Sequence, residues 1–292
     1  MSGSTTIEWT QGLSGRIGAT WNPVTGCSKV SPGCAHCYAE TFAERFRGVN
    51  GHAYERGFDL QMRPERLGLP LRWRQPRLVF VNSMSDLFHD AVPISFIQSV
   101  FRIMSEADQH VFQILTKRHQ RLADVAPCLP WPDNVWIGVS IENHRYLERA
   151  EVLRQIPAAV RFISAEPLLG SLAALNLHGI DWLIAGGESG QQARPMHPVW
   201  VRELRDLCNG ANVPFFFKQW GAHVPDDHWN GGKSAREVLV DHRGFAHGAA
   251  SDAGSRVELI RLRRVGKGAA GRTLDGRTWD RYPTARRSMR VR

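Results

Sequence analysis

Short apolar runs recur along this chain, and most of them end in a cluster of polar residues. Runs rich in Val, Ile and Phe occupy six segments: 77–86, 110–118, 134–143, 160–167, 180–190 and 213–221. Near-continuous apolar runs of this length are typical of strands buried on both faces of a parallel sheet. An earlier segment, 18–27, predicts one more strand before them.

Segments with helical periodicity separate several of these runs. Apolar residues recur at helical spacing in 93–108, 144–156 and 197–211, and Pro93 stands near the start of the first. Strands that alternate with helices indicate a parallel α/β architecture. The connection 167–180 is too short and irregular to predict a helix.

The polar clusters help to choose between an open sheet and a barrel. In both folds the carboxyl ends of parallel strands carry the functional residues. A barrel brings six such ends to a common centre, so the pattern favours a complete or partial TIM-like (β/α) barrel over residues 1–221. The irregular connection favours a distorted or incomplete example. Residues 222–292 are predicted to form an irregular extension and a basic C-terminal region.

Composition narrows the class of protein. Of the 292 residues, 42% are hydrophobic and 22% charged, as in ordinary globular proteins. The N-terminal sequence lacks the pattern of a signal peptide, and no apolar run approaches the ~18–20 residues that span a bilayer. Five unevenly placed cysteines do not fit a secreted disulfide framework. We therefore expect a cytoplasmic protein without a membrane partner.

The positive charge lies at one end of the chain. The formal net charge is +9, and residues 256–292 contain twelve Lys or Arg and three Asp or Glu, which accounts for the whole excess. A basic segment of this kind suits a polyanion, because each neutralised phosphate releases counterions. Nucleic acid is therefore the expected partner of residues 256–292, and a solubilising tail is the alternative.

Three of the five cysteines lie within residues 25–40, which we call the cysteine loop. Cys27, Cys34 and Cys37 have the spacing C-x6-C-x2-C. Three thiolates can hold a [4Fe–4S] cluster, which leaves one iron open for a small-molecule ligand. The loop follows a predicted strand and precedes a predicted helix, so the metal would lie on the functional rim.

A structural zinc ion is the alternative occupant of the cysteine loop. Zinc in a structural site takes four ligands, and His36 or His52 could supply the fourth. Such sites usually stabilise small domains that lack a core, whereas this chain is long enough to bury one. Cys128 and Cys208 lie far away in the sequence and are expected to be structural.

Many motifs of this chain occur in the order in which a known family has them. They are IEWT (7–10), TWNPVTGCSKVSPGCAHCYAE (20–40), SMSDLFH (83–89), QILTKR (113–118), IGVSIEN (137–143), AEPLLG (165–170), AGGESG (185–190), ARPMHPVWVR (193–202), PFFFKQWG (214–221) and GRTLDGRTWDRYP (271–283). Together they resemble a three-cysteine-motif family of uncharacterised proteins associated with phages and bacteria.

That family is in turn similar to radical S-adenosylmethionine enzymes. The resemblance implies a partial barrel, a [4Fe–4S] cluster on the three cysteines, and S-adenosylmethionine bound to the open iron. Reductive cleavage of this cofactor, with an electron from a separate donor, would give a 5′-deoxyadenosyl radical that abstracts hydrogen from a substrate.

Two features differ from the radical enzymes. Their usual spacing is C-x3-C-x2-C, whereas the first gap here contains six residues. Their Gly-Gly-Glu signature follows the second strand and contacts the cofactor's amino group, whereas here it stands near the sixth predicted strand, counting 18–27 as the first. We therefore do not transfer that contact to Glu188. Ser83 and Asp86, after the second predicted strand, are the candidates by position.

The polar strand ends complete the predicted site. We expect catalytic roles for Glu166 and Lys218. The predicted cofactor-binding residues are Ser83, Asp86, Ser140, Glu142, Gly186, Gly187 and Glu188. The predicted substrate-binding residues are Lys117, Arg118, Arg194, Gln219 and Trp220. Trp220, like Trp21, stands beside a site motif and could stack on a base or an adenine ring. A structural role is the alternative for several of them; Glu142 and Asn143 could cap a helix that begins near residue 144.

The leading expectation is a [4Fe–4S] radical S-adenosylmethionine-type enzyme that acts on nucleic acid in repair or modification. A metal-stapled nucleic-acid-binding module without radical chemistry is the second reading. A third is an iron–sulfur hydrolase or nuclease whose carboxylates bind a divalent metal. The acidic residues at the predicted strand ends form no recognisable metal-site motif, which argues against the third.

Overall fold

The computed structural model describes residues 5–13, 15–229, 231, 235–247 and 258–284. It is a mixed α/β fold whose main sheet has seven strands in the order β1-β4-β5-β6-β7-β8-β9. Their bounds are β1 (Ile17–Trp21), β4 (Arg77–Val81), β5 (Val111–Thr116), β6 (Val135–Ser140), β7 (Val160–Ala165), β8 (Trp182–Gly186) and β9 (Phe215–Gln219). Each lies within or close to a segment predicted as a strand, so those predictions are confirmed.

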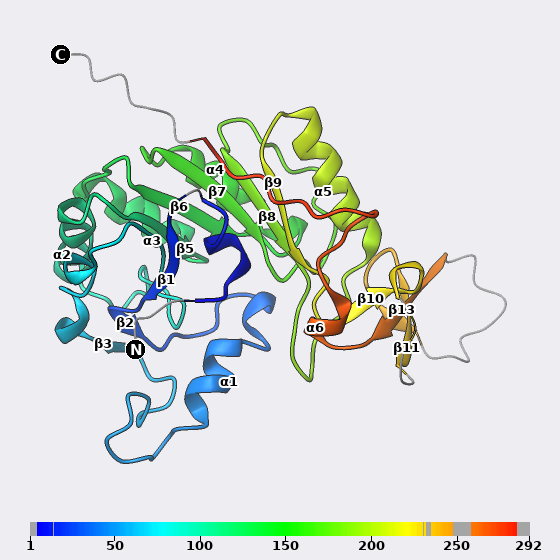
Figure 1. The fold of residues 1–292 in the computed structure, drawn as a ribbon, viewed down its shortest axis with the longest axis horizontal. Coiled ribbons are helices and arrows are strands. Elements are labelled where there is room, and N and C mark those ends of the chain that lie inside the picture. The colour runs from blue at the N-terminus through cyan, green and yellow to red at the C-terminus, as the bar shows by residue number, and fades with distance from the viewer. Residues whose placement is uncertain (1–4, 14, 230, 232–234, 248–257, 285–292) are drawn as a thin grey trace.

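All neighbouring strands of this sheet are parallel, and they follow one another in chain order. The sheet curves in one sense into a half-barrel whose edges are β1 and β9 (Figure 1). The prediction of a partial barrel is therefore confirmed. The carboxyl ends of the seven strands meet along one rim, because parallel strands all point the same way.

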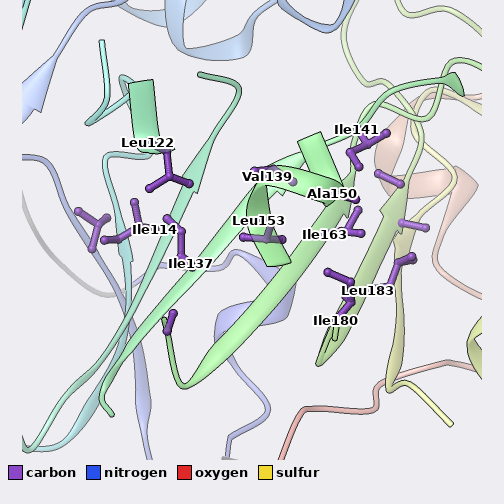
Figure 2. Close-up of a cluster of buried hydrophobic side chains, with 14 of the residues drawn as sticks. Ile114, Leu122, Ile137, Val139, Ile141, Ala150, Leu153, Ile163, Ile180 and Leu183 are labelled. Atoms are coloured by element: carbon purple, nitrogen blue, oxygen red, sulfur yellow. The ribbon is translucent and has the colours of Figure 1, made fainter. Parts of the chain in front are cut away.

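Helices cover the outer face of the half-barrel (Figure 1). They are α2 (Ile94–Glu106), α3 (His119–Val125), α4 (Glu148–Arg154) and α5 (Pro198–Gly210). The segment 144–156, predicted as one helix, is divided into the 3-10 turn η6 (His144–Tyr146) and α4. Figure 2 shows Ile137 and Val139 of β6 among side chains from neighbouring strands and helices, including Leu122 and Leu153. Burial of this apolar surface stabilises the layer by about 25 cal/mol per Å².

The remaining helical and strand elements are short. They are η1 (Glu8–Thr10), β2 (Val24–Thr25), η2 (Pro32–Cys34), α1 (Tyr38–Glu44), β3 (Gln61–Met62), η3 (Pro64–Arg66), η4 (Pro70–Arg72), η5 (Ala126–Cys128), β10 (His223–Pro225), η7 (Asp226–His228), β11 (Arg236–Asp241), β12 (Ala246–His247), β13 (Leu259–Arg264) and α6 (Lys267–Ala270). The antiparallel pair β2 and β3 lies beside the start of the cysteine loop.

Aromatic side chains fill the inner face of the half-barrel. A second buried cluster contains Phe80, Phe162 and Trp182 from the strands, together with Trp9 from η1. The ring centroids of Trp9 and Phe80 lie 4.6 Å apart, in an edge-to-face arrangement. Since η1 contacts β1, β4 and β9, this N-terminal turn packs between the two edges of the half-barrel.

The region after residue 221 is more regular than the predicted irregular extension. Four strands form an antiparallel sheet in the order β10-β13-β11-β12. The chain then returns to the half-barrel, where the Phe217 N–H donates to the Trp279 carbonyl (2.9 Å) and the Arg281 N–H to that of Phe215 (3.2 Å). This segment, drawn in red beside β9 in Figure 1, covers the edge strand. The apolar pattern of the strands was sufficient to predict the barrel. The mixed sequence after residue 221 gave no pattern from which the small antiparallel sheet could be predicted.

Much of the described positive charge in 258–284 is compensated within the protein. Arg263 Nε lies 2.6 Å from Asp226 Oδ1, Arg261 Nε lies 3.2 Å from Glu237 Oε1, and Arg272 pairs with Asp280. The other predicted polyanion-binding residues, at 256 and 286–292, lie outside the described residues. Within the part of the chain that the structure describes, no helix has the length and apolar character needed to cross a membrane.

Candidate functional site

A cavity of about 520 Å³ opens at the carboxyl ends of the barrel strands. Its volume falls in the range of small-molecule sites, roughly 300–1,000 Å³. Twelve of the sequence-predicted site residues line it: Cys27, Cys34, Cys37, Ser83, Asp86, Lys117, Ser140, Glu166, Gly187, Glu188, Lys218 and Gln219. The strands therefore bring most of the predicted residues to one place. Glu142, Gly186, Arg118, Arg194 and Trp220 stand behind the wall or away from it.

The three cysteines of the cysteine loop all face this cavity. Cys27 follows β2, Cys34 ends η2, and Cys37 immediately precedes α1. None is in a disulfide. Burial raises the pKa of the Cys27 thiol to about 11; Asp86 adds to this shift and Arg118 opposes it. Burial also raises the pKa of Cys37. Both thiols are therefore protonated at neutral pH in the metal-free chain, and binding of a metal to the thiolates would release protons.

The three cysteines are not arranged to bind a single metal ion. Among the residues that the structure describes, no three His, Cys, Asp or Glu side chains are grouped closely enough to hold one metal ion. The two histidines considered as zinc ligands have other contacts. His36 Nδ1 lies 3.1 Å from Glu188 Oε2, and His52 stacks on Phe46 with its Nδ1 accepting from the Tyr54 N–H.

Strand-end side chains contact the cysteine loop directly. Arg118 Nη2 donates to the Ser28 hydroxyl (2.7 Å) and carbonyl (3.2 Å). The Ser31 hydroxyl donates to Glu142 Oε1 (2.6 Å). Arg194 Nη2 donates to the Pro32 carbonyl (2.9 Å).

Glu142 is fully buried at the end of β6. Lys117 Nζ lies 3.3 Å from its Oε1, and Arg149 Nη1 donates to its Oε2 over 3.0 Å. Two cations therefore compensate one carboxylate. Helix capping belongs to the next residue, because the Asn143 side chain accepts from the Arg145 N–H (3.0 Å) at the start of η6. The capping alternative is thus correct for Asn143 and does not apply to Glu142.

Glu188 follows β8 and forms a compact ion pair with Arg194. Arg194 donates through Nε (2.9 Å) and Nη2 (2.7 Å) to the two carboxylate oxygens, and its backbone N–H donates to Oε2 (2.8 Å). Burial opposes the charged form, but the hydrogen bonds from Arg194 and His36 together lower the pKa of Glu188. The carboxylate is therefore ionised at neutral pH and engaged by protein donors.

Glu166 and Lys218, predicted as catalytic, form an ion pair on the cavity wall. Lys218 Nζ lies 3.0 Å from Glu166 Oε1, and the Ser164 hydroxyl donates to Oε2 (3.2 Å). Gly186 gives this carboxylate room, since a Cβ at residue 186 would stand 2.8 Å from Oε1. Gly186 thus acts behind the wall, and the carboxylate and ammonium face the cavity.

Asp86 and Ser83 line the cavity after β4, but protein donors already engage them. The Thr116 hydroxyl lies 2.8 and 2.9 Å from the two Asp86 oxygens, which also accept from the backbone N–H groups of Lys117 and Phe88. Ser83 Oγ donates to Asn22 Oδ1 (3.2 Å). These two side chains are therefore less available to a ligand than their position in the sequence suggests.

Gln219 is more available to a ligand. Its Nε2 donates to the Gly187 carbonyl (3.3 Å), whereas its Oε1 is buried and has no protein hydrogen-bond donor. An acceptor in this state on a cavity wall is a candidate contact for a bound polar group.

The two tryptophans predicted to stack on a ligand lie in the core instead. Trp220 is 1% exposed, packs edge-on against Phe217, and donates through Nε1 to the Thr273 carbonyl (2.8 Å). Trp21 is fully buried and donates to the Arg66 carbonyl. Neither lines the cavity. Both indoles are next to a site motif in the sequence, but they do not face the cavity, because successive side chains leave the backbone in different directions.

Sequence reasoning missed a second ion pair on the cavity wall. Lys267 Nζ, from α6, lies 2.9 Å from Glu8 Oε1, from η1. Burial works against the charged form of Glu8, yet the bond from Lys267 helps to lower its pKa. Their meeting depends on tertiary folding of the two ends of the chain, so no local pattern signals it.

Comparison with protein-family models gives one match, over residues 4–283, to the family described as "Protein of unknown function (DUF5131)". No curated protein matches the chain, and neither does any solved structure. The match spans the half-barrel, the cysteine loop, the small sheet and the returning segment 279–281.

Proposed function

This chain belongs to that family of unknown function, and we propose that it is an iron–sulfur enzyme of the radical S-adenosylmethionine type. The observation that carries the proposal is the shared cavity: Cys27, Cys34 and Cys37 line it at the carboxyl ends of a parallel half-barrel. In α/β folds this end of the strands is where ligands bind. The TIM-like relationship of the half-barrel is part of the same proposal.

The donor set fits a [4Fe–4S] cluster. The three thiols are free of disulfides and face one space. In a cubane each cysteine binds a different iron, so the sulfurs surround the cluster and need not converge on one ion. Three cysteine ligands leave the fourth iron for a small molecule. Cys27, Cys34 and Cys37 would hold the cluster, and S-adenosylmethionine would occupy the adjoining cavity.

The cavity wall supplies the groups that would handle the cofactor and substrate. When bound, the cluster and S-adenosylmethionine would supply an electron and a radical able to abstract hydrogen. Gln219 Oε1 would accept from a polar group of the bound molecules, because it has no protein donor. Ser140 lines the same space. The Glu166–Lys218 pair would hold or move a proton at the substrate.

The macromolecular partner remains a prediction from charge. Arg261 and Arg263 of β13 pair with acidic neighbours, and Arg264 donates to the carbonyls of Gly190 and Gln191, so residues 285–292 are the more promising contact for nucleic acid. A separate electron donor is required by the proposed chemistry. The cytoplasmic location likewise stays a prediction.

Anaerobic purification and reconstitution test the proposal. We expect about four iron and four sulfide per chain, with a brown colour, as for one [4Fe–4S] cluster. Cys27→Ala, Cys34→Ala and Cys37→Ala should each lose most of the iron, whereas Cys128→Ala and Cys208→Ala are controls and should retain it. With S-adenosylmethionine and dithionite, the wild type should form methionine and 5′-deoxyadenosine.

Two results would contradict the proposal in different ways. A colourless chain that binds zinc through the same cysteines would remove the cluster and favour a metal-stapled nucleic-acid-binding module. A brown protein that never forms 5′-deoxyadenosine would keep the cluster and remove the radical chemistry.

A further inference from the structure

We infer that Arg118, Glu142 and Glu188 are positioning residues, which attach the cysteine loop to the half-barrel and hold its thiols in place before any cluster is bound. The identity of the bound cluster rests on the proposed function; the attachment itself rests on the contacts. Sequence position had assigned these three residues to cofactor or substrate binding. Their contacts instead lead to the loop.

The first attachment comes from the end of β8. The Glu188 side chain is only 5% exposed and is held by Arg194. From this pair two hydrogen bonds reach the loop, one between Glu188 and His36 Nδ1 (3.1 Å) and one from Arg194 to the Pro32 carbonyl (2.9 Å). Pro32 and His36 each stand two residues from Cys34, one on either side. The pair therefore fixes the backbone around that cysteine.

The second attachment comes from the end of β6. Glu142 is fully buried between two cations and accepts from the Ser31 hydroxyl over 2.6 Å. The loop backbone lies directly against this carboxylate, since a Cβ added at Gly33 would stand 2.4 Å from Oε1. A glycine at this position thus permits the close approach. The loop is held at residues 31–33 by contact as well as by hydrogen bonding.

The third attachment comes from the end of β5. The Arg118 side chain is 7% exposed, and its Nη1 lies 2.6 Å from Asp90 Oδ2. Its Nη2 donates twice to Ser28, the residue after Cys27. His89 Nε2 lies 2.9 Å from the same serine hydroxyl. The beginning of the loop is thereby fixed next to its first cysteine.

Together these attachments hold the loop beside each cysteine. Hydrogen bonds to charged groups are stronger than neutral ones, and a low local dielectric strengthens them further. A loop ordered in advance loses less conformational entropy when it binds its metal group. The polar rim is thus divided: three strand ends hold the loop, while Glu166, Lys218, Ser140 and Gln219 remain for the cofactor and substrate.

Alkylation of the metal-free protein tests the attachment without any cluster. Arg194→Met removes the hydrogen bond to the Pro32 carbonyl, and Ser31→Ala removes the bond to Glu142 together with the 3.8 Å contact between Ser31 Oγ and Cys34 Sγ. Iodoacetamide labelling, followed by peptide mass spectrometry, should show Cys34 reacting about 10-fold faster in both variants, because loss of a hydrogen bond to or from a charged group makes local opening of the loop more frequent. Cys128 is exposed and outside the loop, so its rate serves as an internal reference. Ser31→Thr keeps the hydroxyl and should restore the wild-type rate.

Asp181→Asn is the control for a change in a polar contact outside the cysteine loop. Asp181 is nearly buried at the amino end of β8, where its Oδ2 accepts from the Arg161 N–H over 2.9 Å, far from the loop. This variant should leave the Cys34 rate unchanged. After reconstitution, release of iron to a chelator should be about 10-fold faster in Arg194→Met and Ser31→Ala than in Asp181→Asn.

Unchanged Cys34 labelling in both loop variants would overturn the attachment. If the wild type bound no iron, the proposed function would fail, and the labelling rates would still decide the attachment. If the wild type bound iron while all labelling rates stayed equal, the function would stand and the attachment would fail. Equal acceleration in Ser31→Ala and Ser31→Thr would also overturn it, because the hydroxyl would then have no role.

Discussion

At the scale of single residues, Gly138 shows how a missing side chain shapes the interior of the half-barrel. It lies in β6, and a Cβ placed on it would stand 2.4 Å from the ring of Phe162 in the neighbouring strand. Phe162 is fully buried in the inner aromatic cluster. The ring thus occupies the space that a larger residue at 138 would need.

Gly138→Ala is therefore expected to destabilise the protein by about 1–3 kcal/mol, because the buried ring must shift. Urea unfolding followed by tryptophan fluorescence measures the loss. Gly68→Ala is the control, since no atom lies within 4 Å of its added Cβ. Equal stability of the two variants would show that the ring has room to move.

The candidate site also shows how far sequence reasoning reaches at this scale. Residue type and strand order predicted that Glu142, Glu166 and Glu188 lie at one rim. They did not predict that Glu142 and Glu188 contact the cysteine loop while Glu166 pairs with Lys218. That difference depends on which loop packs against each carboxylate, and the packing involves segments more than 100 residues apart.

At the scale of elements, long buried strands were predictable and short amphipathic pieces were not. β6 is buried along its whole length and reads as an apolar run. β11 (REVLVD) and β13 (LIRLRR) mix charged and apolar residues without a strict alternation, so neither segment showed a clear strand pattern. The turn η1 has three residues and no periodicity, although it carries Trp9 into the barrel.

Removal of the Trp9 ring should cost about 3–5 kcal/mol, as for other buried aromatic side chains. The side chain is 2% exposed and contacts rings from several strands. Chemical denaturation of Trp9→Ala measures the loss, with Phe245→Ala as a control because Phe245 is 64% exposed. A loss below about 1 kcal/mol would mean that the contacts between η1 and the barrel contribute little to the free energy of unfolding.

The small sheet carries a prediction for acid pH. Burial, together with the positive charge of Arg264, lowers the pKa of His223 in β10 to about 4, although Glu188 opposes the shift. In the unfolded chain the pKa is about 6.5, so the native state binds fewer protons between these values. The stabilisation is full above pH 6.5 and is lost as the pH falls toward 4.

At pH 5 this linkage amounts to about 2 kcal/mol for one histidine. His223→Gln should therefore lose less stability than the wild type between pH 7.5 and pH 5. Urea midpoints at the two pH values give the comparison, and other buried histidines contribute equally to both proteins. Equal losses of stability in the two proteins would show that His223 does not contribute to the pH dependence.

At the scale of the whole molecule, the basic C-terminal region has two parts with different roles. Residues 259–281 belong to the fold, since β13 lies inside the small sheet and the returning segment pairs with β9. Deletion of all residues from 256 onward would therefore remove structural elements. Residues 285–292 contain four arginines and no acidic residue, and they are the part suited to test contact with nucleic acid.

Deletion of 285–292 should weaken binding to single-stranded DNA or RNA and reduce the slope of log affinity against log salt by up to about 3. Fluorescence anisotropy at several salt concentrations measures both quantities. Thermal unfolding of the truncated chain provides the control for folding. An unchanged slope would exclude these arginines from phosphate contact.

The covered edge of β9 has a consequence for the order of events during synthesis. Residues 279–281 supply its backbone partners, and Lys267 meets Glu8 at the cavity. A ribosome that has made only residues 1–221 has already produced all three loop cysteines and every strand of the barrel. Lys267, which lines the cavity beside them, is still missing, and β9 still exposes an unpaired edge to other nascent chains. Completion of the cavity and of this sheet edge therefore waits until residues 267–281 have been synthesised.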